Sequence, residues 1–387
     1  MSHDESIAVL GEGVTARSIH AYLNRHGVSC VPIDQAETLI VSPGIPPRNF
    51  PKTNAAIVPE IEWSYLKLQQ KKQPPFVIAV TGTNGKSTVS TLLGHFLDAP
   101  VFGNIGIPLT EAIDCDPCPT TIIVEVSSFQ LECCRYFRAD IVILLNISED
   151  HIDRHTSFEN YIQAKSKLVD ALLEKDLLIY NQNDPIVCQL SNRCVAKKRA
   201  FSTDLLRDYH YELPIVKDSL AAAISGVEYL SISPTIIQEK LNSFRPLAHR
   251  IEKVACIKDR LFFNDSKSTT PSSTLAALKT FPKKVHLILC GNHKNIDFSS
   301  YKEALLKHSL SISVFGDLSP CIAALFHSSS IPIYIHDTML DAVSLLFPKT
   351  KANDIILFSP AGASFDQFQN FKERGEHFKS IVHQLCS

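Results

Sequence analysis

Residues 80–88, Val-Thr-Gly-Thr-Asn-Gly-Lys-Ser-Thr, decide the fold of the central part of the chain. The apolar run 76–80 predicts a buried strand before them, and apolar residues at helical spacing predict a helix over 86–97. A glycine loop in this position lets backbone N–H groups turn toward a phosphate. The sequence does not match the strict P-loop pattern, because Val80 occupies the position of its first glycine. The residues that would bind phosphate and Mg²⁺, Gly82, Gly85, Lys86 and Ser87, are nevertheless present. We therefore predict a nucleotide site rather than an ordinary turn, made of Gly82, Thr83, Asn84, Gly85, Lys86, Ser87 and Thr88.

Two side chains of this loop and one carboxylate further along suit Mg²⁺ and ATP. Lys86 would reach the outer phosphates, and the Ser87 hydroxyl could bind Mg²⁺. Glu125 ends a predicted strand, and open α/β sheets bind their ligands at the carboxyl ends of strands. A carboxylate there can hold a second face of the ion, although taken alone a strand-end glutamate is as often a cap or a surface charge.

The same strand–helix rhythm runs through the chain in three stretches. Strands are predicted at 7–10, 30–33, 38–41, 76–80, 121–126, 141–146, 177–180, 261–263, 285–289, 312–315, 333–335 and 355–358, and a long helix at 157–175. The polar segments 69–75 and 242–248 separate the stretches, and 181–214 gives few signals. We therefore expect an α/β fold of three consecutive domains: a Rossmann-like domain over 1–72, a P-loop-type ATPase domain over 73–243 and a second Rossmann-like domain over 244–387.

A weaker glycine loop follows the first predicted strand. Gly11-x-Gly13-x-x-Ala16, with Asp34 about twenty residues further on, matches a dinucleotide fingerprint. A lone match of this kind is often accidental. The loop could be a tight turn, or a site for the phosphates and sugar of a different nucleotide.

Polar clusters follow several other strands. The run 146–155, Asn-Ile-Ser-Glu-Asp-His-Ile-Asp-Arg-His, could be a solvated loop or could supply a cation ligand, and spacing alone does not separate His151 from His155. In the last third, 264–269 and 359–368 could be loops with capping serines or parts of a site. Lys294 could be a surface lysine or a carboxylate anchor.

The composition excludes several classes of protein. The chain has 387 residues, 45% of them hydrophobic, and its formal net charge of -2 argues against a general binder of nucleic acid or anionic membranes. No apolar stretch reaches the ~18 residues that cross a bilayer. The eleven cysteines are expected to be free thiols in a reducing cytoplasm, and a lone CxxC at 115–118 is a weak basis for a metal site.

Six runs in this order resemble a known family, the Mur ligases: TGTNGKST, EVSSFQLE, NISEDHIDRH, AHR, NDSKSTT and SPAGASFDQF. These are ATP-dependent enzymes that build the peptide of bacterial cell-wall precursors. The SSFQLE and SFDQF runs resemble the branch that adds D-glutamate to UDP-N-acetylmuramoyl-L-alanine through an acyl phosphate. The resemblance implies a cytoplasmic ligase of cell-wall synthesis, cell shape and cell division, expected to be monomeric, with ATP and two Mg²⁺ ions.

The resemblance also implies roles for single residues. In the first domain it implies contacts to the UDP-sugar at Val14, Thr15, Asp34, Ser42 and Gly44. In the central domain it implies ATP at 82–88, Mg²⁺ ligands at Ser87, Glu125, His151 and a carbamylated Lys165, and muramoyl contacts at Asn104 and Ser127. In the last domain it implies ATP contacts at Arg250, Asp265 and Lys267, and a D-glutamate pocket at Thr269, Lys294, Ser364, Phe365 and Phe371. The implied catalytic residues are Lys86, His151 and Lys165; without the family, Lys165 reads as a solvated helix lysine.

Three departures from the family pattern keep alternatives open. Ile215 and Asp218 stand where the family has asparagines that contact adenine, only five residues separate Asp34 from Ile40, and Gly291-Asn292-His293 replaces a Gly-Gly turn. A sister ligase adding another amino acid is one alternative, although the Asp-Asn-Pro-Arg run of the diaminopimelate-adding members is absent from the sequence. A non-catalytic nucleotide-binding homologue is the other.

Overall fold

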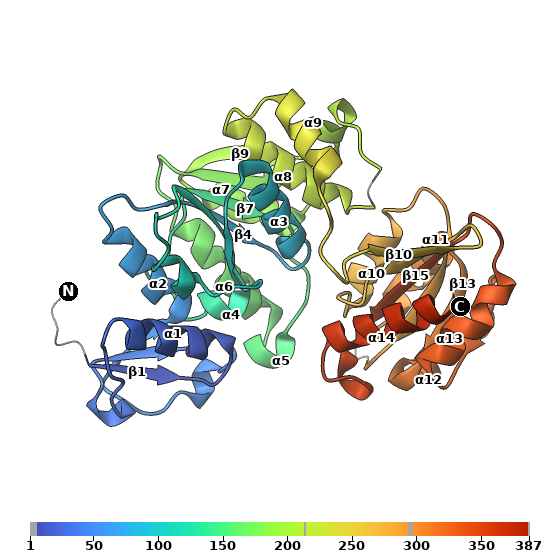
Figure 1. Cartoon of the computed structure of the whole chain (residues 1–387), viewed down its shortest axis with the longest axis horizontal. Coiled ribbons are helices and arrows are strands. Elements are labelled where there is room, and N and C mark those ends of the chain that lie inside the picture. Colours follow the sequence, from blue (N-terminus) through green and yellow to red (C-terminus); the bar gives the residue numbers. More distant parts are fainter. Residues whose placement is uncertain (1–5, 213, 293–296, 386–387) are drawn as a thin grey trace. The chain divides into compact units, whose positions relative to one another are not determined.

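The computed structural model describes residues 6–212, 214–292 and 297–385. Its strands form three sheets, one of three strands and two of six (Figure 1). The chain divides into two compact units, one made of Met1–Tyr211 and Asp218–Phe244, the other of Glu212–Lys217 and Arg245–Ser387. The predicted α/β class with parallel sheets is confirmed, while the three predicted domain ranges stay predictions.

The first sheet is parallel and has the order β1-β2-β3. Its strands are β1 (Ile7–Leu10), β2 (Thr38–Val41) and β3 (Ala56–Pro59), and its helices are α1 (Val14–Arg25) after β1 and α2 (Glu60–Gln69) after β3. The strand predicted at 30–33 is wrong. Val31 donates to the Ile7 carbonyl, but Pro32 follows it and has no N–H to continue a ladder. The chain instead turns into the 3-10 helix η1 (Ile33–Gln35).

The second sheet has the order β5-β6-β4-β7-β8-β9, and each neighbouring pair is parallel. Its strands are β4 (Phe76–Thr81), β5 (Val101–Gly103), β6 (Thr121–Glu125), β7 (Ile141–Leu144), β8 (Leu177–Asn181) and β9 (Lys197–Phe201). Because β4 lies between β6 and β7, the loops that follow these three strands emerge side by side at the carboxyl edge of the sheet.

Helices cover both faces of this second sheet. They are α3 (Lys86–Leu97), α4 (Ser128–Leu131), α5 (Ile152–His155), α6 (Phe158–Asp170), α7 (Pro185–Arg193), α8 (Lys217–Tyr229) and α9 (Pro234–Ser243). Helix α6 ends earlier than predicted, because the Asp176 carboxylate accepts the N–H of Leu173 and closes a turn. On α8, Gly226 permits close packing: a Cβ there would lie 3.2 Å from Leu93 on α3.

The third sheet has the order β10-β11-β15-β12-β13-β14, with only the β10–β11 pair antiparallel among the described strands. Its strands are β10 (Glu252–Ile257), β11 (Arg260–Asn264), β12 (Val285–Cys290), β13 (Ser309–Phe315), β14 (Ile333–Ile335) and β15 (Ile355–Ala361). Its helices are α10 (Pro271–Leu278), α11 (Lys302–His308), α12 (Ser319–Phe326), α13 (Met339–Leu346) and α14 (Phe371–Gln384).

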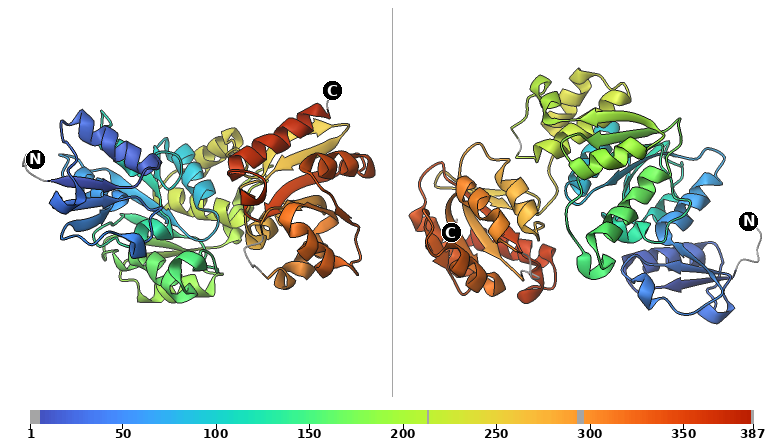
Figure 2. Two further views of the ribbon diagram at one scale, coloured as in Figure 1. Left: turned by 90° about the horizontal axis from the view of Figure 1, so that it is seen from below. Right: turned by 180° about the vertical axis from the view of Figure 1, so that it is seen from behind.

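Alternation along β12 explains the two layers of helices on the third sheet. Leu287 and Leu289 belong to a core shared with α10, α11 and α12, whereas Ile288 belongs to a core shared with α13 and α14. Successive side chains of a strand point to opposite faces, so a strand buried on both faces is apolar throughout. Figure 2 shows these layers from two further directions.

Several loops contain short 3-10 turns: η2 (Pro47–Asn49), η3 (Leu109–Ala112), η4 (Thr203–Asp208), η5 (Ser299–Tyr301), η6 (Gly316–Leu318), η7 (Phe347–Lys349) and η8 (Ser364–Asp366). Within the described ranges, none of the helices has the length and apolar character needed to span a membrane. The cysteines of these ranges are free thiols.

Candidate functional site

The loop between β4 and α3 has the backbone of a phosphate cradle. Gly82 and Gly85 have φ angles of +153° and +88°, in the region that side chains rarely adopt. A Cβ at Gly82 would lie 2.9 Å from the Cβ of Leu145, and one at Gly85 would lie 2.7 Å from the Ser219 hydroxyl. Glycine is therefore required at both turns, as the sequence predicted for a loop that wraps a ligand.

The loop that follows β7 braces this cradle from one side. Asn146 accepts the N–H of Asn84 on its Oδ1 at 2.8 Å and donates from Nδ2 to the Asn84 carbonyl at 3.0 Å. Thr83 accepts the N–H of Ser148 on Oγ1 at 3.0 Å, and Tyr161 of α6 lies 2.9 Å from the same oxygen. Asn146 and Tyr161 thus fix the loop, and no sequence pattern predicted a role for either of them.

Two predicted catalytic lysines converge on one carbonyl of the loop. Lys86 donates from Nζ to the carbonyls of Gly82 and Thr83 at 2.9 Å, and Lys165 donates to the Gly82 carbonyl at 2.8 Å. Lys165 is 1% exposed, so its reading as a solvated helix lysine is wrong. Burial, followed by the charge of Lys86, holds the pKa of Lys165 well below its usual value.

Glu125 reaches the same edge from the end of β6. It is 1% exposed, and its Oε1 accepts a 2.7 Å hydrogen bond from the Asn104 side chain. Its Oε2 is buried without a hydrogen-bond partner among the described residues. A buried unsatisfied carboxylate oxygen is costly, and hard divalent cations prefer such oxygens. These residues therefore fit a cation such as Mg²⁺.

The remaining predicted residues of the central sheet lie on short helices near this edge. Ser127 caps α4, with Gln130 completing a reciprocal capping box. His151 is the N-cap of α5, with φ +56°, and its ring centroid lies 4.7 Å from that of Phe129. The His151 side chain is 44% exposed, whereas His155 is buried and lies 3.0 Å from the Ser128 hydroxyl. Exposure thus separates the two histidines, which spacing could not, and leaves His151 the one that faces solvent.

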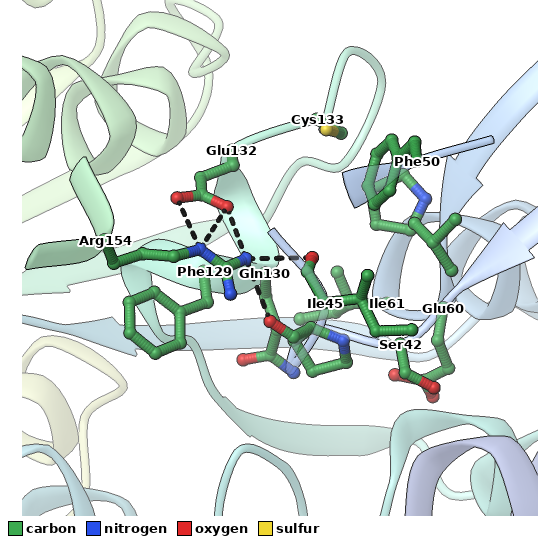
Figure 3. A pocket seen from close by; sticks show the side chains of 13 residues that line it. Ser42, Ile45, Phe50, Glu60, Ile61, Phe129, Gln130, Glu132, Cys133 and Arg154 are labelled. Carbon is green, nitrogen blue, oxygen red and sulfur yellow. Dashed lines mark hydrogen bonds and ion pairs between the residues drawn. The ribbon is translucent and has the colours of Figure 1, made fainter. Parts of the chain in front are cut away.

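Arg154 is one of the residues that line a small pocket beside α4 and α5 (Figure 3). Its guanidinium contacts both carboxylate oxygens of Glu132 and also backbone carbonyls of the loop after β2, at Pro43, Gly44 and Ile45. The sequence singled out Arg154 as one of the charges of the 146–155 run but gave it no role.

The predicted UDP-sugar residues lie around the carboxyl edge of the first sheet. Val14 and Thr15 are the first residues of α1, Asp34 is an exposed residue of η1, and Gly44 is exposed in the loop after β2. Ser42 is 7% exposed, and its hydroxyl is buried without a hydrogen-bond partner among the described residues. A Cβ at Gly11 would lie 2.4 Å from that hydroxyl, so Ser42 stands directly against the glycine loop.

Two predicted runs meet in the C-terminal unit. Asp265 accepts a 2.7 Å hydrogen bond from the Ser359 hydroxyl, and its N–H donates to the Phe358 carbonyl at 2.7 Å. Burial raises the pKa of Asp265 to about 6. The end of β11 and the end of β15 therefore form one polar surface, although the sequence offered capping loops as an alternative.

The other predicted residues of this unit are only partly brought together. Lys267 lies 3.9 Å from the centroid of the Phe371 ring. Ser364 is buried in η8, Phe365 is 73% exposed, and Arg250 and Thr269 are half-buried. Lys294 lies outside the described residues. Of the two departures in the adenine region, Ile215 is 4% exposed and Asp218 is the second residue of α8.

Known proteins match this chain in sequence over most of its length. Residues 80–217 match the family described as Mur ligase middle domain. The UDP-N-acetylmuramoylalanine–D-glutamate ligase of Thermosipho melanesiensis is 32% identical over 363 residues, covering 91% of this chain and 84% of the relative. The enzyme of that name from Natranaerobius thermophilus is 33% identical over 405 residues, covering 94% and 87%.

Solved structures of similar fold are more distant in sequence. MurF from Thermotoga maritima in complex with ADP aligns with a TM-score of 0.65 at 17% identity, over 98% of this chain and 96% of its own. The UDP-N-acetylmuramate-alanine ligase MurC of the same organism aligns at 0.61 with 16% identity, over 98% and 100%. The chain belongs to the Mur ligase family and is an ATP-dependent ligase of peptidoglycan precursor synthesis.

Proposed function

We propose that this ligase joins D-glutamate to UDP-N-acetylmuramoyl-L-alanine. The observation that carries the proposal is the convergence of Lys86 and Lys165 on the Gly82 carbonyl of the phosphate loop. Such a site suits phosphoryl transfer to an acid. The names of the relatives and the SSFQLE and SFDQF runs support D-glutamate as the amino acid.

The proposed chemistry has two steps. A carboxylate oxygen of the muramoyl-alanine attacks the γ-phosphorus of ATP, the bond to the bridging oxygen breaks, and ADP leaves. The free amine of D-glutamate then attacks the acyl carbon, inorganic phosphate leaves, and the nitrogen loses one proton as the amide forms. The chain's residues supply positions and charges rather than a nucleophile.

Lys86 and the loop N–H groups are proposed to hold the phosphates. Ser87, Glu125, His151 and a carbamylated Lys165 are proposed to hold two Mg²⁺ ions, which would screen the phosphates against the incoming carboxylate. The unpartnered Oε2 of Glu125 supports a cation there, and the burial of Lys165 beside Lys86 favours a modification that removes its positive charge.

We propose the remaining predicted residues as substrate contacts. In the first sheet these are Val14, Thr15, Asp34, Ser42 and Gly44, followed by Asn104 and Ser127 for the muramoyl group. In the C-terminal unit, Arg250, Asp265 and Lys267 are proposed for ATP, and Thr269, Lys294, Ser364, Phe365 and Phe371 for D-glutamate.

The test is release of ADP by the purified chain with Mg²⁺, ATP and UDP-N-acetylmuramoyl-L-alanine. We expect release to depend on D-glutamate and to exceed that with L-alanine, L-lysine or meso-diaminopimelate. Lys86→Ala should lower the rate by about 100-fold or more with the fold intact, because a donor to the transferring group is lost. Release with another amino acid would identify a sister ligase.

A second candidate, a non-catalytic nucleotide-binding homologue, is motivated by Ile215 and Asp218, which replace the asparagines of the family. The same experiment tests it. Binding of ADP without turnover in the presence of any of these amino acids would favour this candidate over the ligase.

A further inference from the structure

Arg154 has no role in the proposed reaction, yet its side chain makes hydrogen bonds to Glu132 and to the loop after β2. It lies on α5 and its side chain is 8% exposed. From Nε and Nη2 it donates to the Glu132 carboxylate at 2.6–3.1 Å, in a two-point contact that only a guanidinium can make. Its guanidinium also lies 4.5 Å from the centroid of the Phe129 ring.

The remaining donors of Arg154 reach a different part of the chain. Nη1 donates to the Gly44 carbonyl, and Nη2 donates to those of Pro43 and Ile45, each at 3.1 Å. Three successive carbonyls of the loop after β2 are thus directed at one cation, and Figure 3 shows the contacts to two of them, those of Pro43 and Ile45. The orientation of this loop, which follows a strand of the first sheet, is therefore fixed by a residue of α5, which belongs to the second sheet.

This loop begins at Ser42, which stands against the glycine loop of the first sheet. The Ser42 N–H donates to the Leu10 carbonyl at 3.0 Å, while its hydroxyl is buried beside Gly11 and has no hydrogen-bond partner in the described part of the chain. A buried unsatisfied hydroxyl at a proposed UDP-sugar site is available to a ligand oxygen. Arg154 therefore orients the backbone of the loop that carries this hydroxyl.

We propose that Arg154 is a positioning residue for the nucleotide-sugar. Glu132 holds its guanidinium, and Arg154 in turn fixes the position of the 42–45 loop relative to the 146–155 loop that carries His151. The UDP-sugar then binds in one orientation relative to the phosphate loop. The inference rests on the proposed function. Glu132 shares this positioning role, because its carboxylate holds the Arg154 guanidinium. The same carboxylate lies 3.3 Å from Nδ1 of the buried His155.

The expected signature is a change in one Michaelis constant. Arg154→Lys keeps a positive charge but cannot contact Glu132 at two points and three carbonyls at once. We expect the KM for UDP-N-acetylmuramoyl-L-alanine to rise about tenfold, the size of one lost charge-assisted hydrogen bond, and to rise further in Arg154→Ala. The KM values for ATP and D-glutamate, and kcat, should change less than twofold. Glu132→Gln should raise the same KM by a smaller factor.

Arg25 offers a matched control. It also joins two segments, since it contacts Asp114 and Glu111 from α1, but it is exposed and lies away from the 42–45 loop. Arg25→Lys should leave all three KM values unchanged. Fluorescence of Trp63, the single tryptophan, and the melting temperature report whether each variant keeps its fold.

The outcomes separate the inference from the function on which it rests. A wild-type chain without D-glutamate-dependent ADP release overturns the proposed function. A wild-type chain that turns over, with Arg154→Lys showing an unchanged KM for the UDP-sugar, overturns the inference alone. A loss of kcat and melting temperature with all KM values unchanged would show that Arg154 is merely structural, and would also overturn it.

Discussion

At the scale of single residues, Lys165 has an unusual environment for a lysine, because it is buried beside a second lysine. It is buried, donates to the Gly82 carbonyl and has Lys86 as a neighbouring cation. Lys165→Ala should lower ADP release by about 100-fold, since an anion proposed to hold a metal would be lost. Formate or acetate should restore part of the rate by placing a carboxylate in the vacated space.

Lys167→Ala is the control for this prediction, because Lys167 lies on the same helix and is exposed. It should retain its activity and gain nothing from added carboxylates. A ¹³C-bicarbonate experiment gives a direct readout: a carbamate signal is expected in the wild type and in Lys167→Ala, and not in Lys165→Ala. Full activity of Lys165→Ala without carboxylates would refute the carbamate role.

The sequence predicted those residues of the site whose signal is local. The glycines of the phosphate loop, with Lys86 and Ser87, are read from eight consecutive letters, and Glu125 from its place at a strand end. Asn146 and Tyr161 were missed because their partners lie 62 and 78 residues away in sequence. An asparagine or tyrosine becomes part of a site only through such distant contacts, which no local pattern encodes.

At the scale of elements, α2 is held to η3 by a buried acid. Glu60 is 2% exposed and accepts hydrogen bonds on Oε1 from the Thr110 N–H, the Thr110 hydroxyl and the Ser64 hydroxyl. Burial raises the pKa of Glu60 above its usual 4.5. The stability contributed by this raised pKa is therefore complete below pH 4.5 and is lost as the pH rises through the folded-state pKa.

Glu60→Gln keeps the accepting oxygen and removes the titration. We expect the melting temperature of this variant, relative to the wild type, to increase as the pH rises above 4.5. The exposed Glu239→Gln on α9 should show no such trend. A difference between Glu60→Gln and the wild type that does not vary with pH would contradict the raised pKa.

Elements with strong apolar periodicity were predicted well, and short or proline-marked ones were not. The strands at 7–10, 38–41 and 333–335 have the predicted bounds, whereas β3, β5, β9 and β10 were missed. β3 and β5 have only three or four residues and end in proline or glycine, and β9 and β10 begin with charged residues, so none has the apolar run that marks a strand. Conversely, the apolar residues at 30–33 suggested a strand that Pro32 prevents.

At the scale of the whole molecule, each of the two compact units has its own apolar core. Leu178 on β8 and Leu289 on β12 are matched probes of these cores, since both are leucines at 0% exposure on parallel strands. The sequence predicted that parallel sheets would occur in both parts. It could not predict how stable each would be, since that depends on packing summed over distant residues.

We expect two transitions in scanning calorimetry. Leu178→Ala should lower one and Leu289→Ala the other, each by about 3 kcal/mol of unfolding free energy, because truncating a buried leucine loses its transfer energy and leaves a cavity. ADP with Mg²⁺ should raise the midpoint of the transition that Leu178→Ala marks, since ligand binding to the folded phosphate loop stabilises the unit that contains it. If both leucine variants lower a single shared transition, the units do not unfold separately. If ADP with Mg²⁺ does not raise the midpoint of this transition in the wild type, and Lys86→Ala gives the same midpoint with and without ADP, the phosphate loop does not hold the nucleotide.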